Sequence, residues 1–262
     1  MVSNADERGL IVYEHPLNER IRTLLRLEFL FDQGEFGAEG DTAFHSRIAI
    51  DTLVDIVSLL SRGDLRSEIQ KELERVVATL ETLQQRQGVD AARLGSILDE
   101  CSGVMERLRS SPPGIPSEIR DNEFLNSIAQ RAGILGGSCG FDVPSYHLWL
   151  HASADRRRSD LGQWFDGFRY LKQASRLLLR LLRDSAGPSP ERAEGAVFQA
   201  NFERNNRYQL LRVGVPVDAD CFPEISGNRH FCTIRFMRQP DPCERPQQAE
   251  EDIHFELTRC VV

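Results

Sequence analysis

The chain has 262 residues, a net charge of −8, and 40% hydrophobic and 27% charged residues, a composition typical of globular proteins with one large or two smaller domains. The acidic balance argues against general nucleic-acid binding. No apolar run reaches the roughly 18–20 residues of a membrane span, and Met1–Arg8 lacks the apolar core of a secretion signal. We therefore expect a cytoplasmic protein with neither a nucleic-acid nor a membrane partner.

The six cysteines are scattered through the chain, and none belongs to a C-x-x-C pair. This spacing argues against a zinc knuckle or a redox pair, so we interpret the cysteines as small apolar residues. The only lysines are Lys71 and Lys172, and all other residues counted as Lys or Arg are arginines. Because salt screens charges beyond about 8 Å, a local group of arginines can bind an acidic segment despite the negative total.

The first elements expected are a strand at Ile11–Tyr13, which is rich in β-branched and aromatic residues, and a helix over Pro16–Phe31, with the proline at its first position. Apolar residues recur along this helix at helical spacing, which predicts a buried face. Arg26 lies between two leucines, so we expect it to be buried and to need an acidic partner. The glycine-rich and acidic stretch Asp32–Asp41 predicts a loop.

Further helices are expected where apolar residues recur at helical spacing between capping and stop signals. They cover Thr42–Ser61, Asp64–Gln87, Asp90–Arg109, a short segment from Asp121, Pro144–His151 and Asp155–Asp184. The fifth segment also alternates like a strand, but Asp142 as a cap and Pro144 at the start favour a helix. Asp166-Gly167 predicts a bend in the last helix, while Glu72 and Arg156–Arg158 are expected on solvated faces.

After a firm break at Pro112-Pro113 and a second change of character at Gly187–Pro190, the chain shows short strand-like runs separated by proline and glycine. These runs are Ala196–Phe202, Tyr208–Val215, His230–Met237 and Ile253–Leu257. The pattern predicts an α+β fold. A mostly helical domain is expected over residues 15–188, and a small antiparallel β domain over residues 195–262, completed by the N-terminal strand within residues 1–14.

Two stretches invite a catalytic interpretation that the residues support weakly. Gly136–Gly140 lacks the lysine and the strand–loop–helix frame of a phosphate-binding loop, so we interpret it as a turn. Cys139, His147 and Asp142 offer a nucleophile, a base and an orienting carboxylate, but closeness in sequence is no evidence of the geometry that such a triad needs.

His147 and His151 lie four residues apart and would share one face of a helix, which is how two histidines bind zinc. Asp155 is the available third ligand, so a metal-dependent hydrolase is kept as the alternative function. The packing of Tyr146 and Trp149 into the core is the simpler interpretation of this segment. We therefore expect no catalytic residue, no cofactor and no metal, and an interaction module rather than an enzyme.

Three motifs together resemble the ZapD family, bacterial cell-division proteins that associate with the FtsZ ring. The motifs are Glu14–Arg20 running into Leu25–Leu30, Gly136–Pro144 with His147–His151, and Pro223–Gly227 followed by Ile234–Met237. The resemblance extends over nearly the whole chain and includes the Arg62-Gly63 turn. It implies a helical and a β domain, a homodimer, and a basic groove between the two domains that receives the flexible C-terminal tail of FtsZ.

The resemblance also implies a function without catalysis: cross-linking and bundling of FtsZ filaments in the cytoplasm at mid-cell, which promotes assembly and stability of the Z-ring during septation. The residues that match basic positions of the family are Arg26, Arg62, Arg66, Arg131, His147, Arg229 and Arg235. Two positions depart from the pattern, because Glu123 and Phe231 stand where relatives can carry a basic residue. These two departures predict a less basic groove than in other members.

Overall fold

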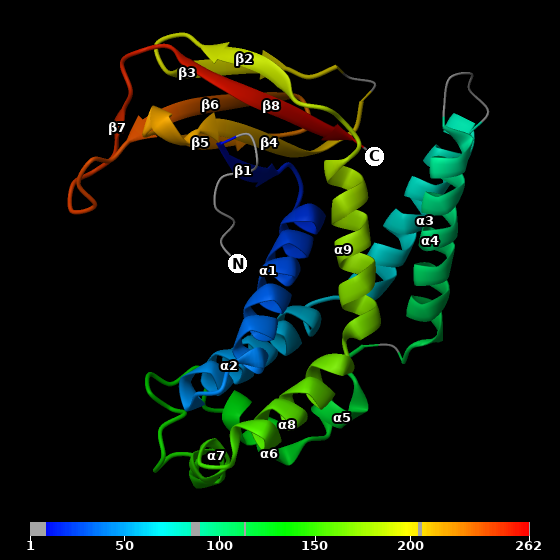
Figure 1. Cartoon of the computed structure of the whole chain (residues 1–262), viewed down its shortest axis with the longest axis vertical. Coiled ribbons are helices and arrows are strands. Elements are labelled where there is room, and N and C mark those ends of the chain that lie inside the picture. The colour runs from blue at the N-terminus through cyan, green and yellow to red at the C-terminus, as the bar shows by residue number, and fades with distance from the viewer. Residues whose placement is uncertain (1–8, 85–89, 113, 204–205, 262) are drawn as a thin grey trace. The chain divides into compact units, whose positions relative to one another are not determined.

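A computed structural model describes residues 9–84, 90–112, 114–203 and 206–261, and it has an α+β fold (Figure 1). The expectations for Met1–Arg8, Gln85–Gln87 and Pro113 lie outside the described residues. The chain divides into two compact units, unit 1 with residues 24–178 and unit 2 with residues 2–23 and 179–262. The domain limits expected from the sequence stay a prediction. Among the described helices, none is long and apolar enough to cross a membrane.

The helices confirm most of the periodicity-based expectations. They are α1 (Glu19–Glu39), α2 (Ala43–Leu60), α3 (Leu65–Gln84), α4 (Ala91–Ser110), α5 (Ser117–Arg120), α6 (Glu123–Ala129), α7 (Pro144–Leu150), α8 (Ala154–Asp166) and α9 (Arg169–Arg183). Asp90 caps α4 by accepting from two backbone amides. The expected bend at Asp166-Gly167 is a complete break between α8 and α9. The short helix α5 was not expected.

Two expected caps are replaced by neighbouring residues. Helix α6 is capped by Asn122, whose Oδ1 accepts from the Leu125 amide at 3.1 Å, and not by Asp121. Helix α7 begins after Val143 without a side-chain cap, because the Asp142 carboxylate instead accepts from the Cys139 thiol at 3.3 Å. Pro144 at the first helical position is nevertheless confirmed.

The loop expected at Asp32–Asp41 is wrong, because α1 continues to Glu39. Its glycines allow a close helix–helix approach within unit 1. A Cβ on Gly34 would lie 2.6 Å from the Phe165 ring, and a Cβ on Gly37 would lie 2.7 Å from the backbone nitrogen of Ala49 in α2. Glycine therefore serves here to bring two backbones together and not to end a helix.

This packing gives a stability prediction with a matched control. Gly37→Ala should lower the free energy of unfolding of unit 1 by about 2 kcal/mol, because the added methyl group meets backbone that cannot rotate away. Gly95→Ala, in α4, meets nothing within 4 Å and should raise stability by about 0.5–1 kcal/mol through helix propensity. Urea unfolding followed by tryptophan emission measures both changes. Equal effects at the two positions would contradict the packing argument.

The burial expected for Arg26 is wrong, because this side chain is exposed. An acidic partner for it, from this chain or another molecule, stays a prediction. The buried face of α1 is formed by Ile21, Leu24, Leu27 and Phe31. At about 100° per residue, the direction of residue 26 falls on the opposite side of the helix from this face. Its neighbours in sequence therefore do not describe its surroundings.

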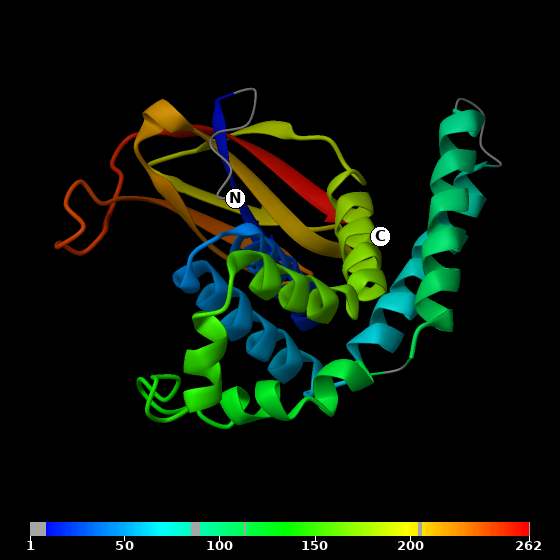
Figure 2. The ribbon, with the colours of Figure 1, turned by 60° about the horizontal axis from the view of Figure 1, so that its bottom comes forward.

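Two polar positions expected on solvated faces are buried. Arg157 in α8 is 6% exposed, and Glu72 in α3 is fully buried and pairs with Arg75, with Nη1 2.6 Å from Oε2. Glu72 shares a face with Leu65 and Ile69 in α3, which lies antiparallel beside α4 as a helical hairpin (Figure 2). A charged residue at a core-facing position of a helix is buried with its face, and it then needs a partner.

Unit 2 contains two antiparallel sheets where the sequence suggested one. The strands are β1 (Leu10–Pro16), β2 (Ser189–Ala193), β3 (Val197–Asn201), β4 (Tyr208–Pro216), β5 (Phe222–Gly227), β6 (Phe231–Arg238), β7 (Gln247–Gln248) and β8 (Ile253–Val261). One sheet has the order β1-β4-β8-β2, and the other has the order β3-β6-β5 with β7 beside β6. The N-terminal strand completes the first sheet by pairing with β4, from Leu10 opposite Pro216 to Pro16 opposite Leu210.

Prolines explain the strands that the sequence did not predict. β2 contains Pro190 and β5 contains Pro223, and both strands lie at sheet edges, where a missing N–H breaks no ladder. The same holds for Pro16, which ends the edge strand β1 and does not begin α1. Asn18 caps that helix instead, with its Oδ1 3.0 Å from the Ile21 amide nitrogen.

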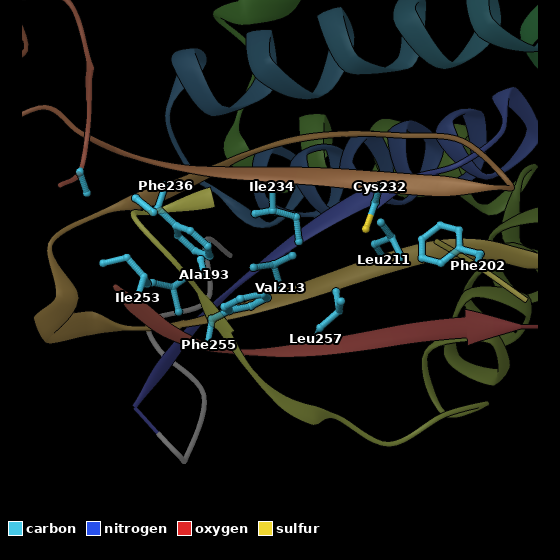
Figure 3. Close-up of a cluster of buried hydrophobic side chains, with 13 residues drawn as sticks. Ala193, Phe202, Leu211, Val213, Cys232, Ile234, Phe236, Ile253, Phe255 and Leu257 are labelled. Atoms are coloured by element: carbon cyan, nitrogen blue, oxygen red, sulfur yellow. The ribbon is translucent and has the colours of Figure 1, made fainter. Parts of the chain in front are cut away.

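The core of unit 2 lies between the two sheets (Figure 3). Ile234 and Phe236 on β6 face Val213 on β4 and Phe255 on β8. The rings of Phe236 and Phe255 have centroids 5.0 Å apart, which joins the sheets through an aromatic contact. Residues along β6 alternate between the core and the outer face of the sheet. Phe231, Thr233 and Arg235 lie on the outer face.

An ion-pair cluster fixes the end of α9 to the first sheet within unit 2. The Glu14 carboxylate on β1 accepts from Arg183 at 2.8 Å through both oxygens and from Arg212 on β4 at 3.0 Å. All three side chains are largely buried. A bidentate guanidinium–carboxylate pair of this kind fixes orientation as well as charge.

Candidate functional site

A cavity of about 680 Å³ lies within unit 1, where the α2–α3 turn, the end of α4, α5 and the α8–α9 break meet. Its apolar lining includes Leu60, Leu108, Ile119, Trp164 and Phe168. Several of these side chains are buried members of the core, so the floor of the cavity is fixed by packing. A concave apolar site of this size accommodates a few side chains of a peptide.

Arg62 and Arg66, which the family resemblance selected, both line this cavity. Arg62 is exposed on the α2–α3 turn and forms no ion pair with any described carboxylate. Arg66 is half-buried, and its Nη2 donates to the backbone oxygens of Leu108 at 2.6 Å and Arg109 at 2.9 Å. Since α4 ends there, Arg66 satisfies carbonyl groups that the helix itself leaves unpaired. Its Nε is buried without an acceptor among the described residues.

The charges around the cavity have both signs. Hydrogen bonds from Ser67 lower the pKa of the Asp64 carboxyl, so this group remains ionised. Asp166 pairs with Arg169, whose guanidinium lies 4.5 Å from the centre of the Tyr170 ring. Arg62 and Arg66 are therefore the cavity arginines without a carboxylate partner among the described residues.

Arg131 and His147 border a second region of unit 1, the loop between α6 and α7. Arg131 is exposed in the turn after α6, and its oxygen accepts from the Ile134 amide at 2.9 Å. His147 is exposed on α7, and its ring packs so close to Gly140 that a Cβ there would lie 2.9 Å from Nδ1. Gly140 therefore leaves the space that the His147 ring fills.

The two histidines of the alternative function lie side by side, and no third ligand joins them among the described residues. The ring centroids of His147 and His151 are 4.5 Å apart, and His151 Nδ1 donates to the His147 backbone oxygen at 2.8 Å. Asp155 pairs with Arg158. Within the part of the chain that the structure describes, no group of three His, Cys, Asp or Glu side chains could hold a metal ion.

Cys139 and Asp142 contact each other, as the sequence allowed, but as a thiol donating to a carboxylate. No described contact joins His147 to either of them, although its ring lies beside Gly140. The glycine-rich stretch is a series of turns, with the Cys139 amide bonded to Gly136 and the Asp142 amide bonded to Cys139. These contacts support the turn interpretation of Gly136–Gly140.

Unit 2 places the remaining two candidates near the β5–β6 hairpin. Arg235 is exposed on the outer face of β6, opposite Glu224 on β5 and Val197 on β3 in the sheet register. Arg229 lies in the hairpin loop, where its Nε donates to His230 Nε2 at 2.9 Å. Phe231, one of the two departures from the family pattern, is 46% exposed beside them.

The seven candidates therefore fall into three pairs and one separate residue, Arg26 on the exposed face of α1. The sequence did not identify the cavity that Arg62 and Arg66 line, or Trp164 and Phe168 within it. The apolar periodicity of Asp155–Asp184 indicated that both aromatic residues face inward. It could not show that they border a cavity, because the cavity depends on the break at Gly167 and on the position of Pro116. A Cβ at position 167 would lie only 3.1 Å from the Pro116 ring.

Comparison with known proteins agrees with the motifs. The family model described as ZapD, cell division protein, matches residues 25–235, a range that includes all seven candidates. The protein named cell division protein ZapD from Methylococcus capsulatus is 41% identical over 255 residues, covering 97% of this chain and 100% of the relative. The proteins of that name from Janthinobacterium sp. (strain Marseille) and Nitrosomonas eutropha are each 38% identical over 251 residues, covering 96% of this chain and 99% of the relative.

Proposed function

Because the chain belongs to the ZapD family of cell division proteins, we propose that it binds the C-terminal tail of FtsZ and cross-links FtsZ filaments, and so promotes assembly and stability of the Z-ring. It acts as a homodimer in the cytoplasm at the division site, without enzymatic activity. The observation that carries this proposal is a set of exposed arginines at family positions that form no ion pair with any described carboxylate. They are Arg26, Arg62, Arg131 and Arg235.

Such arginines suit an acidic peptide. A guanidinium group offers five N–H donors in a planar fork, and a carboxylate accepts two of them in parallel. Several other arginines of this chain already form ion pairs with carboxylates. Arg176, for example, pairs with Asp32 at 2.6 Å and with Glu35 at 2.7 Å. The unpaired arginines therefore keep their donors available, and Arg62 presents them at the rim of an apolar cavity.

The test of the proposal is co-sedimentation of FtsZ polymers with this protein at increasing salt, using full-length FtsZ and FtsZ without its tail. Full-length polymers should be bundled, and the effect should weaken as salt screens the charge pairs. Polymers without the tail should not be bundled. Equal bundling of both would contradict tail binding, and bundling of neither would contradict the proposed function.

Individual arginines can be tested by the affinity for a tail peptide. Arg62→Ala and Arg235→Ala should each weaken binding by about 10-fold, the loss expected for one charge-assisted contact. Fluorescence anisotropy of a labelled peptide measures this change. Arg93→Ala on α4 and Arg245→Ala in the β6–β7 loop remove exposed arginines outside the candidate set and serve as controls. A similar loss in the controls would show that total charge, and not a site, determines binding.

A further inference from the structure

Strand β3 of unit 2 has an open edge. It lies at one end of the sheet order β3-β6-β5 and pairs with β6, from Val197 opposite Arg235 to Asn201 opposite Phe231. No other described strand runs along its second side. Backbone N–H and C=O groups at such an edge have the geometry to bond a further strand.

Backbone hydrogen bonds identify the residues that face this open edge. Two bonds join the ends of β3 to β6, from the Phe236 amide to the Ala196 oxygen at 2.9 Å and from the Phe202 amide to the His230 oxygen at 2.7 Å. Every second residue of an antiparallel ladder faces its partner strand, so the even-numbered residues from 196 to 202 face β6. Val197 faces the other way, and its amide bonds Glu194 in the preceding turn. Gln199 and Asn201 also face the open edge, where no described group bonds their amides.

The other strands that end the two sheets each contain a proline, which lacks the N–H that a further strand would need. These prolines are Pro16 in β1, Pro190 in β2 and Pro223 in β5. Strand β3, with the sequence VFQAN, contains neither a proline nor a charged residue. Proteins commonly protect open edges with proline or charge. The absence of both from β3 makes this edge suited to strand addition by a peptide.

A hollow of about 390 Å³ lies beside the same strand. It is lined by Gln199, Ala200 and Asn201 from β3 and by Phe231, Cys232 and Thr233 from β6. Figure 3 shows the core side chains of β6 pointing into the space between the sheets, so Phe231 lies on the opposite face. Asn201 is directly opposite Phe231, and the Phe231 side chain is 46% exposed. The hollow therefore offers an aromatic wall to one apolar side chain of a peptide on β3.

The charges near this edge favour an acidic peptide. Arg235 lies opposite Val197 at one end of β3, and Arg229 lies in the β5–β6 loop beyond the other end. Neither guanidinium group forms an ion pair with any described carboxylate. Glu224 is opposite Arg235 on β5, on the side of β6 away from β3. A peptide that follows β3 would therefore have an arginine near each of its ends.

We propose that an extended acidic peptide adds to β3 as a further strand, and that the flexible FtsZ tail is this peptide. Its main chain bonds Gln199 and Asn201, one apolar side chain enters the hollow beside Phe231, and its carboxylates bind Arg229 and Arg235. Main-chain bonds accept many sequences, so the hollow and the two arginines provide the selectivity. The inference rests on the proposed function, which supplies the tail as the partner.

Tail peptides methylated at one backbone nitrogen at a time test strand addition without any change to the protein. An added strand directs every second amide toward β3. Methylation should therefore weaken binding by about 10-fold or more at alternate positions and by far less between them. Competition against a labelled tail peptide, followed by fluorescence anisotropy, measures each affinity. A loss without this alternation, or no loss at any position, would overturn the proposal.

The matching change in the protein is Gln199→Pro, which removes an N–H that faces the open edge and breaks no bond to β6. It should weaken tail binding by about 10-fold or more, whereas Gln199→Ala keeps the amide and should weaken it by about 2-fold or less. Unchanged amide exchange along β8 would show that unit 2 of the variant is folded. Equal losses for the two substitutions would assign the effect to the side chain and overturn the main-chain role.

The outcomes distinguish this inference from the proposed function. Tail binding that resists both Gln199→Pro and methylation would overturn strand addition and leave the proposed function intact. A wild-type chain that binds no tail would contradict the proposed function and this inference with it. An altered sedimentation coefficient of Gln199→Pro, with unchanged tail affinity, would assign the β3 edge to a second copy of the chain and overturn the tail as its partner.

Discussion

Replacing Arg157 by methionine should lower the free energy of unfolding of unit 1 by about 3 kcal/mol. Arg157 is 6% exposed and has no carboxylate partner among the described residues. Its Nε donates to Ser46 Oγ at 2.9 Å, its Nη1 to the oxygens of Leu150 and Ala152, and its Nη2 to the oxygen of Asp41. Each buried acceptor left without a donor costs about 1–3 kcal/mol, and methionine restores only the packing.

Urea unfolding followed by tryptophan emission measures this change in unit 1 alone, because both tryptophans lie there. Arg156→Met is the matched control. The neighbouring Arg156 is 73% exposed and lies 3.9 Å from Asp160, so its loss should change stability by less than about 0.5 kcal/mol. A small effect at Arg157, comparable to that at Arg156, would contradict the role assigned to its four acceptors.

Arg157 also shows where sequence-based prediction ends. Three consecutive arginines at the start of a helix indicate a solvated surface, and this holds for Arg156 and Arg158. The middle arginine is buried, and its acceptors include Ser46 Oγ and the backbone oxygen of Asp41, both far away in sequence. Backbone acceptors carry no sequence signal. Only the assembled fold shows that carbonyl groups converge on this position.

Local patterns predicted most elements correctly because periodicity and capping are local properties. Asp90 as a cap and Pro144 at the start of α7 are confirmed, and the bend expected at Asp166-Gly167 is a break between two helices. Glycine and proline were misleading where their role is set by a neighbouring element. Gly37 permits contact with α2, and Pro223 occupies an edge strand. In both cases the deciding fact is which backbone lies alongside.

The candidate residues came from the family resemblance, because exposure and pairing of an arginine cannot be derived from the residues beside it. Arg26 shows this directly, since its leucine neighbours suggested burial and the helix turns it to the surface.

FtsZ polymers should bind this protein at least about 10²-fold more tightly than an isolated tail peptide does. Binding one tail orders a flexible segment, and that ordering costs part of the interaction free energy, so a single site is weak. A dimer with two sites on a polymer with many tails converts the second contact into an intramolecular event, which multiplies affinity by about 10²–10⁴ when the geometry permits. A 10²-fold gain corresponds to about 2.7 kcal/mol.

Peptide anisotropy and polymer co-sedimentation at one salt concentration give the two affinities. Polymers of FtsZ without its tail are the control, because they should lose the additional affinity together with bundling. Two tails joined by a flexible linker should recover part of the gain for the wild type. Equal affinities of the wild type for peptide and polymer would contradict bivalent cross-linking, because one tail contact would then account for all of the binding.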